Sequence, residues 1–379
     1  MPSAEATPKT GLVISGEKFE HFDTIEFTKS IDTFSTLSFT APFEPDRKEF
    51  RKRFRPFSYS SVNGLIDDKV RFTGEMLTPE PSVDPESASV AVSCYSLPAV
   101  LGDCCPPGVA FPLEFSGMTL QQIAQTICNY FGITAKYDAT VSVDESAHAF
   151  TKAKIHRGPR GGRGKRGNKF ARCALEPGDQ AHEFLVKLAQ QIGLVMSDDE
   201  VGNLVFRDSD ATLGDPVARL AEGEQPLVSV KANFRPQEYF SEITAFVPER
   251  LRKKGMHHSE FNPFTRGTQI RRPHCFKLDS LQTPADAPAA CWAKMGRMLG
   301  SCASWTIDGL PTWRGPSGDL WTPNTTILVK APHAWIFDDY EFLIRDVTLH
   351  QDKDVFTASL NVVMPGAFSG AMPESLPWD

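Results

Sequence analysis

The sequence predicts a β-rich α+β protein, with two β-barrel domains and a small α/β domain between them. Three observations support this class. Apolar and polar residues alternate through the first hundred residues, apolar residues recur at helical spacing in the middle of the chain, and alternation returns after about residue 228. The 29 Pro, 27 Gly and 27 Phe among 379 residues also favour strands and turns over a helical bundle.

The first predicted domain covers residues 1–105. Apolar residues alternate with Ser, Thr or Ala over 36–41 and again over 89–94, as a half-buried antiparallel sheet requires. The charged segment 44–55 is expected on the surface of this first barrel, as a loop or a short helix.

Residues 106–215 are predicted to form the small α/β domain. Thr119 and Gln122 have the spacing of a capping box, and apolar residues then recur at helical spacing up to Phe131. Asp179 is the expected N-cap of a second helix, and a hairpin follows it. The carboxylate pairs Asp198-Asp199 and Asp338-Asp339 lie beside turn signals and are interpreted as solvated turn residues.

Residues 216–365 are predicted to form the second β-barrel domain, which contains a helix near 288–300. The strand-like alternation is clearest over 356–362. Residues 366–379, with two prolines, are expected to form an extended tail.

A basic loop, defined here as residues 152–172, interrupts an acidic chain. It contains nine Lys and Arg and no acid, which leaves 31 Lys and Arg against 47 Asp and Glu elsewhere. Its Gly-rich cations suit either an acidic protein neighbour or nucleic-acid phosphates, and we favour the neighbour because an otherwise acidic surface repels DNA. Salt-sensitive DNA binding that disappears when the loop is deleted would favour phosphates instead. The candidate contact residues are Arg157, Arg160, Arg163, Lys165, Arg166 and Lys169.

The sequence contains none of the common catalytic motifs: no nucleophile elbow, P-loop, zincin motif or dinucleotide fingerprint. His257-His258 and His274-Cys275 are adjacent pairs, whose side chains point to opposite faces of a strand and do not share one ion. We therefore expect no enzyme activity, metal or cofactor. The eight cysteines form no Cys-x-x-Cys pair, and neither a signal peptide nor a membrane-spanning run is present, so synthesis in a host cytoplasm is expected.

Four tryptophans, Trp305, Trp313, Trp321 and Trp335, fall within about thirty residues. Core packing is the default interpretation. The alternative is that some anchor a subunit interface, where Trp is enriched, and Trp313 and Trp321 are the candidates for such contacts.

Seven segments, in order along nearly the whole chain, resemble the central baseplate hub proteins of Mu-like contractile-tailed phages. This family is related to the hub domains of type VI secretion spike proteins. The similar segments are 71–76, 90–104, 118–134, 183–206, 308–324, 343–347 and 376–378. Relative to this pattern the basic loop is an insertion.

The resemblance implies a structural virion protein of the tail baseplate that forms a homotrimeric ring. In such a ring the two β-barrels of each subunit alternate, so that one side matches the hexameric tail tube and the other the trimeric central spike. Wedge proteins surround it, and DNA passes through the lumen at ejection without specific binding. Two alternatives remain from the sequence: a spike-base component of a tailocin or type VI-like secretion apparatus, and a tail-associated cell-wall hydrolase.

Overall fold

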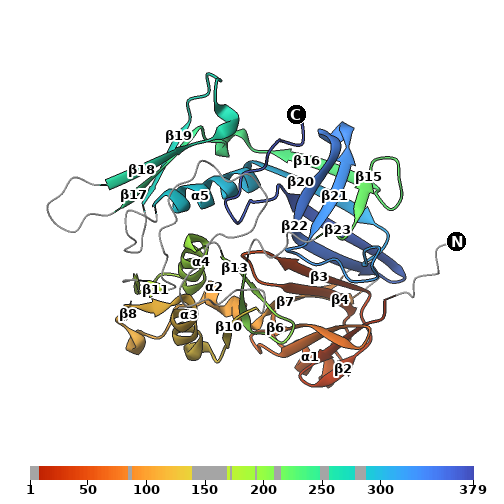
Figure 1. The fold of residues 1–379 in the computed structure, drawn as a ribbon. Helices are drawn as coiled ribbons and strands as arrows, with labels where there is room; N and C mark the ends of the chain where they lie inside the picture. Colours follow the sequence, from red (N-terminus) through yellow and green to blue (C-terminus); the bar gives the residue numbers. More distant parts are fainter. Residues whose placement is uncertain are drawn as a thin grey trace.

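The computed structural model describes residues 8–83, 88–138, 169–170, 173–192, 194–208, 215–247, 256–277 and 287–379. Within these ranges strands predominate, and the longer helices lie together in the left half of Figure 1, apart from a short N-terminal helix at the lower right. A β-rich protein with a helical part in the middle of the chain was predicted, and this class is confirmed.

The N-terminal region is an antiparallel sheet with one short helix. Ile25 and Phe27 face the core and alternate with more exposed neighbours, as do Leu37, Phe39 and Ala41, so the predicted alternation is confirmed. The expected surface segment contains a six-residue helix, whose Phe50 is buried while its cations are exposed or half-buried. The elements are β1 (Thr10–Ile14), β2 (Glu17–Phe19), β3 (Thr24–Ser30), β4 (Thr36–Pro42), α1 (Lys48–Arg53), β5 (Ser61–Ile66), β6 (Lys69–Val83) and β7 (Ala88–Ser96).

The middle region is a small α/β unit with its own apolar core. Thr119 and Gln122 form the predicted capping box, in which the Gln122 amide N–H donates to Thr119 Oγ1 over 3.3 Å. The second helix begins at Ala181, two residues after the expected N-cap. The elements are α2 (Val100–Asp103), β8 (Leu113–Phe115), β9 (Met118–Thr119), α3 (Leu120–Cys128), β10 (Ala135–Tyr137), β11 (Lys169–Phe170), β12 (Cys173–Leu175), α4 (Ala181–Gln191), β13 (Leu194–Asp198) and β14 (Leu204–Asp208).

The C-terminal region returns to strands around one long helix, which lies where a helix was predicted near 288–300. Its elements are β15 (Arg219–Ala221), β16 (Ser229–Phe234), α5 (Ala287–Cys302), β20 (Ala303–Leu310), β21 (Thr326–Ala331), β22 (Ile336–Asp352) and β23 (Val355–Val363). A separate three-stranded sheet projects beside α5, formed by β17 (Glu242–Val247), β18 (Met256–Phe261) and β19 (Pro273–Lys277) (Figure 1).

One 13-stranded sheet joins the N-terminal and C-terminal regions. Its main path runs in the order β16-β20-β23-β22-β3-β4-β7-β6-β5-β1-β2, and β21 and β15 extend from β22. The two regions meet where β22 pairs with β3, from Asp346 opposite Ser30 to Asp352 opposite Thr24. The described strands therefore form no closed barrel within one chain. Because β22 is 17 residues long, it pairs with β21 and β23 and still reaches β3.

The hydrophobic core follows this topology. The largest cluster of buried side chains draws residues from both ends of the chain, among them Phe39, Trp305 and Phe342. The α/β unit has a separate cluster around Ile123 and Phe206. The segment after β23 has no helix or strand, but Phe368, Met372 and Leu376 are buried, so this predicted extended tail is packed against the protein.

Gly74 gives a test of the β6–β7 packing. A β-carbon at Gly74 would clash with the backbone oxygen of Tyr95, which cannot move without breaking the sheet. Gly74→Ala is therefore expected to lower the free energy of unfolding by about 1–3 kcal/mol, the range for overpacking a well-packed site. Urea denaturation measures this change. The matched control is Gly102→Ala in α2, where a β-carbon meets no atom within 4 Å. An equal loss of stability in both variants would contradict the clash.

Candidate functional site

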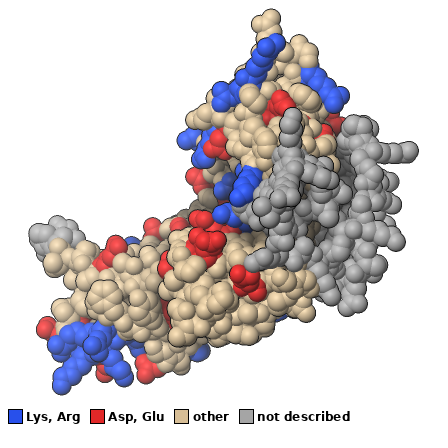
Figure 2. Space-filling view, turned by 90° about the vertical axis from the view of Figure 1, so that its left-hand side faces the viewer, with Lys and Arg blue, Asp and Glu red and all other residues tan. Residues whose placement is uncertain are grey.

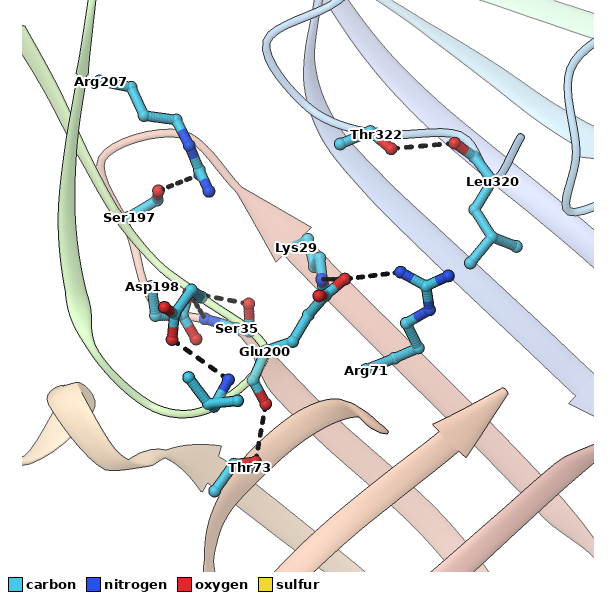
Figure 3. Close-up of polar contacts among 12 residues, drawn as sticks. Lys29, Ser35, Arg71, Thr73, Ser197, Asp198, Glu200, Arg207, Leu320 and Thr322 are labelled. Carbon is cyan, nitrogen blue, oxygen red and sulfur yellow. Dashed lines mark hydrogen bonds and ion pairs between the residues drawn. The ribbon is translucent and has the colours of Figure 1, made fainter. Parts of the chain in front are cut away.

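The turn between β3 and β4 is the place where the three regions of the chain meet (Figure 3). Residues 31–35 of this turn contact the hairpin β13–β14 of the α/β unit, and the helix α5 and strand β22 of the C-terminal region also reach it. Since no catalytic site was expected, this junction is the candidate functional site. Its residues hold the three regions of the chain together and carry out no reaction.

Hydrogen bonds that involve backbone and side-chain groups hold the turn against β13. The Asp32 amide donates to the Met196 carbonyl over 2.8 Å, and the Met196 amide donates back to Asp32 Oδ1 over 3.0 Å. Asp198 Oδ1 accepts hydrogen bonds from both the amide and the hydroxyl of Ser35, at 3.1 and 2.8 Å. Asp198 is 8% exposed. The interpretation of Asp198 as a solvated turn residue was therefore wrong. Its carboxylate is buried and accepts the hydrogen bond of the Ser35 amide, which a neighbouring strand would otherwise accept.

A largely buried ion pair joins the same turn to α5. Arg297 Nη1 donates to Asp32 Oδ2 over 2.5 Å, and the two side chains are 16% and 12% exposed. The guanidinium also lies over the ring of Phe368, 5.1 Å from its centroid. Phe368 belongs to a small apolar cluster that takes one or more residues from each region: Ile31, Val195, Leu343, Val363, Ala367 and Phe368.

A second polar group lies beside this turn, around Glu200. Arg71 donates to Glu200 Oε1 over 2.7 Å, and Lys29 Nζ lies 3.6 Å from the same oxygen. Thr73 Oγ1 donates to the Glu200 carbonyl over 2.7 Å (Figure 3). Burial lowers the pKa of Lys29 below its ordinary value, and the nearby carboxylates oppose this shift. The β13–β14 turn is thus held on the N-terminal sheet by charge as well as by hydrogen bonds.

A cavity of about 170 Å³ lies between the turn, the hairpin and the loop 322–324. Most of the residues that line it carry polar side chains, among them Lys29, Ser197, Arg207 and Asn324. The Asn324 side-chain oxygen is buried and has no hydrogen-bond partner among the described residues. A cavity of this size and polarity can hold several waters, which would complete the hydrogen bonds of such groups.

His182, at the start of α4, faces the same turn. Its ring lies tilted against Phe34, with centroids 4.7 Å apart, and lies close to the backbone of Asp32. Burial lowers the pKa of His182 below its ordinary value, and the contacts with Asp32 oppose this shift.

The described part of the chain contains no group of three or more His, Cys, Asp or Glu side chains that could hold a metal ion. Burial raises the pKa of the thiols of Cys128, Cys173, Cys291 and Cys302, which makes them poor nucleophiles near neutral pH. No helix within these described residues is long and apolar enough to cross a membrane.

Most of the basic loop lies outside the described residues, including the candidates Arg157, Arg160, Arg163, Lys165 and Arg166. Lys169 is described by its backbone alone, which pairs in β11 with Thr119 of β9. The loop therefore ends beside the capped start of α3, and its contacts with an acidic neighbour stay a prediction.

Trp313 and Trp321 lie in the core of the protomer instead of on its surface. They are 0% and 4% exposed. The Trp313 indole N–H donates to the His350 and Thr357 carbonyls, and the Trp321 indole N–H donates to the Thr312 carbonyl. A buried indole whose N–H is already hydrogen-bonded has no surface left for a subunit contact. Trp313 and Trp321 therefore pack in the core, as the default interpretation had it, and are not exposed for a subunit contact.

Exposed aromatic residues occur elsewhere. Phe57 and Tyr59 follow α1 and are 87% and 53% exposed, and Trp335 and Phe337 lie before and within the start of β22 at 58% and 43%. The sequence analysis named Trp335 among four tryptophans but did not single out Phe57, Tyr59 or Phe337, although Phe57 and Tyr59 follow directly after the charged segment 44–55. Figure 2 shows that Lys and Arg also gather at separate ends of the face that it draws, with Asp and Glu between them.

The fold is that of phage tail proteins. The 43 kDa tail protein of prophage MuSo2 from Shewanella oneidensis superimposes with a TM-score of 0.73 at 21% identity, over 95% of this chain and 99% of that one. A tail protein from Neisseria meningitidis MC58 gives 0.70 at 16% identity, over 97% and 100%. A type VI secretion component of E. coli gives 0.52 at 11% identity, over 93% and 76%. No family model matches the chain.

In sequence, the chain is a homologue of the baseplate hub protein gp44 of Escherichia phage Mu. The two are 25% identical over 297 residues, which cover 75% of this chain and 69% of that protein. The resemblance to Mu-like baseplate hubs is therefore confirmed. These relatives are named as structural parts of a tail, so the expectation that the chain is not an enzyme is also confirmed.

Removing Arg297 tests the ion pair at the junction. Arg297→Met leaves the Asp32 carboxylate buried without its cation, so the free energy of unfolding is expected to fall by about 3 kcal/mol. Urea denaturation of Arg297→Met, Asp32→Asn and the double variant gives the coupling, and the double variant should lose less than the two single losses together. Lys9→Met is the control, since Lys9 and its partner Asp68 are both exposed. Additive losses would rule out a direct coupling.

The lowered pKa of His182 predicts that the stability of the protein depends on pH. Because its folded pKa is below the ordinary value of 6.5, the unfolded chain binds more protons in the window between them. Stability is then lost as the pH falls through about 6.5 towards the lower folded value. His182→Phe should lose less stability than the natural protein between about pH 7.5 and about pH 5, measured by urea denaturation at each pH. A parallel fall in both proteins would show that other groups cause the acid sensitivity.

Proposed function

We propose that this protein is the central hub of a contractile phage tail baseplate, a homotrimeric ring that joins the hexameric tail tube to the trimeric central spike. The observation that carries the proposal is the homology to the baseplate hub gp44 of phage Mu across three quarters of the chain. A structural likeness that covers 99% of a prophage tail protein supports it. The protein would then reside in the virion, with the tube, spike and wedge proteins as its partners.

The junction suits this role mechanically. A hub must transmit force between the tube and the spike without separating into its parts. Here a continuous sheet, a largely buried ion pair and a shared apolar cluster connect the regions of one protomer. In the proposed ring the N-terminal and C-terminal β-rich regions alternate around a lumen through which DNA passes without specific binding.

The domain boundaries remain part of the proposal. We assign 1–105 and 216–365 to the two β-rich domains and 106–215 to the α/β domain. The separate core cluster of the α/β unit supports its assignment as a domain. Limited proteolysis that released a stable fragment across one of these boundaries would contradict the division.

The oligomeric state tests the proposed ring directly. Light scattering of the purified protein is expected to give a mass near three times the 41.9-kDa protomer. A protomer mass that persists at high concentration, and after the matching spike protein is added, would contradict the ring.

A further inference from the structure

Three exposed aromatic residues have backbone conformations that such side chains rarely adopt. Phe57, Tyr59 and Trp335 have φ angles of 59°, 47° and 62°, in the left-handed region. They are the aromatic residues with positive φ in the described part of the chain, and each is more than half exposed. A bulky residue in this region is strained, and strain of this kind concentrates where side chains are presented for function.

Phe57 and Tyr59 belong to a basic aromatic patch, which we define as Lys48, Arg51, Lys52, Arg55, Phe57 and Tyr59. Its four cations are exposed and form no ion pair with another described residue, whereas the neighbouring Arg47 and Arg53 pair with Glu44 and Glu17. Phe50 and Phe54 are buried and pack together, with ring centroids 6.1 Å apart, so they fix α1 on the sheet. The patch is therefore a firmly held surface with unpaired positive charge.

Trp335 belongs to an acidic aromatic patch, which we define as Glu222, Glu224, Trp335, Phe337, Asp338 and Asp339. The Trp335 and Phe337 rings lie 6.0 Å apart. Asp338 is 94% exposed, and its nearest cation, Lys330, is 3.9 Å away. Asp339 and Glu224 share Arg219, and Glu222 pairs with His333. Four carboxylates thus face two permanent cations and a histidine.

The two patches cannot meet within one protomer. The helix α1 lies at one end of the molecule, whereas β21 and β22, which flank Trp335, lie across the β3–β22 junction towards the other end (Figure 1). Each patch combines aromatic anchors with a net charge, and the two net charges are opposite. Glu49 lies among the four cations of the basic aromatic patch, and two cations and a histidine lie beside the four carboxylates of the acidic aromatic patch. Aromatic and Arg anchors carry most of the energy of interfaces, while complementary charge fixes partner and register.

We propose that the basic aromatic patch of one protomer docks on the acidic aromatic patch of a second copy of this chain. The contact is heterologous, with a different surface on each side, and a heterologous contact closes a ring when its rotation divides a full turn. This inference rests on the proposed hub function and adds to it the surfaces that would join neighbouring protomers. A second copy is favoured as the partner because the same chain carries both complementary surfaces.

Glycine substitutions separate docking from folding. Phe57→Gly and Trp335→Gly each remove an aromatic anchor and at the same time relieve the left-handed backbone. The melting temperature of the protomer under dissociating conditions should be unchanged or higher. The dissociation constant of the oligomer, from sedimentation or light scattering over a dilution series, should rise at least about tenfold. If the melting temperature falls and association is unaffected, the aromatics serve the fold and the proposal is overturned.

Charge reversal tests whether the two patches touch each other. Lys52→Glu and Asp338→Lys should each weaken association, and the chain that carries both changes should regain it, because the reversed charges again attract. Lys187→Glu and Glu183→Lys, at exposed positions of α4, are the matched controls and should leave the dissociation constant unchanged.

The outcomes distinguish this inference from the proposed function. If the natural protein forms a trimer that neither glycine nor charge variants weaken, the ring stands and the assigned surfaces are wrong. If the single charge variants weaken association and the double variant does not recover, the two patches bind other surfaces, and direct docking is overturned. If the natural protein never associates, the proposed ring and the interface fail together.

Discussion

The side chain and backbone of Asp32 connect the three regions of this protein. One carboxylate oxygen and the backbone amide exchange hydrogen bonds with Met196 of the α/β unit, and the other oxygen accepts from Arg297 on α5. Asp32 can do this because it has a φ of 60°, which Asp tolerates better than most residues and which turns the chain back between β3 and β4. A residue three positions on, Ser35, then meets Asp198.

Around this turn, polar and apolar contacts have different roles. Hydrogen bonds and ion pairs fix the direction in which the α/β unit leaves the sheet, since each depends strongly on geometry. The apolar cluster includes Ile31, next to Asp32 in the chain, and Phe368, whose ring lies under the Arg297 guanidinium. Apolar surroundings of this kind strengthen an ion pair. The three regions of the protomer are therefore joined by both kinds of contact at one turn, which is consistent with the proposed hub function.

Local features of the fold were predictable from the sequence, whereas long-range ones were not. The capping box at Thr119 and the alternation in β4 and β7 depend on neighbouring residues, so their patterns are visible in a short window. The β3–β22 pairing joins residues more than 300 positions apart, for example Thr28 and Thr348. No local pattern records such a partner, which is why two separate barrels were expected. The burial of Asp198 was missed for the same reason. Core packing was the default for Trp313, but the sequence could not exclude it as an interface candidate. The positive φ of Phe57 and Trp335 leaves no mark in composition.

The distance between β3 and β22 along the chain also governs how the protein reaches its native state. Contacts of high sequence separation form slowly, because a long loop must close before they give any stability. Until β22 arrives, the edge of β3 presents unpaired backbone groups and the apolar side chains of Ile25 and Phe27. In a crowded cell that edge is open to a β22 strand from another copy. Domain-swapped oligomers are therefore the misfolded product that this topology favours.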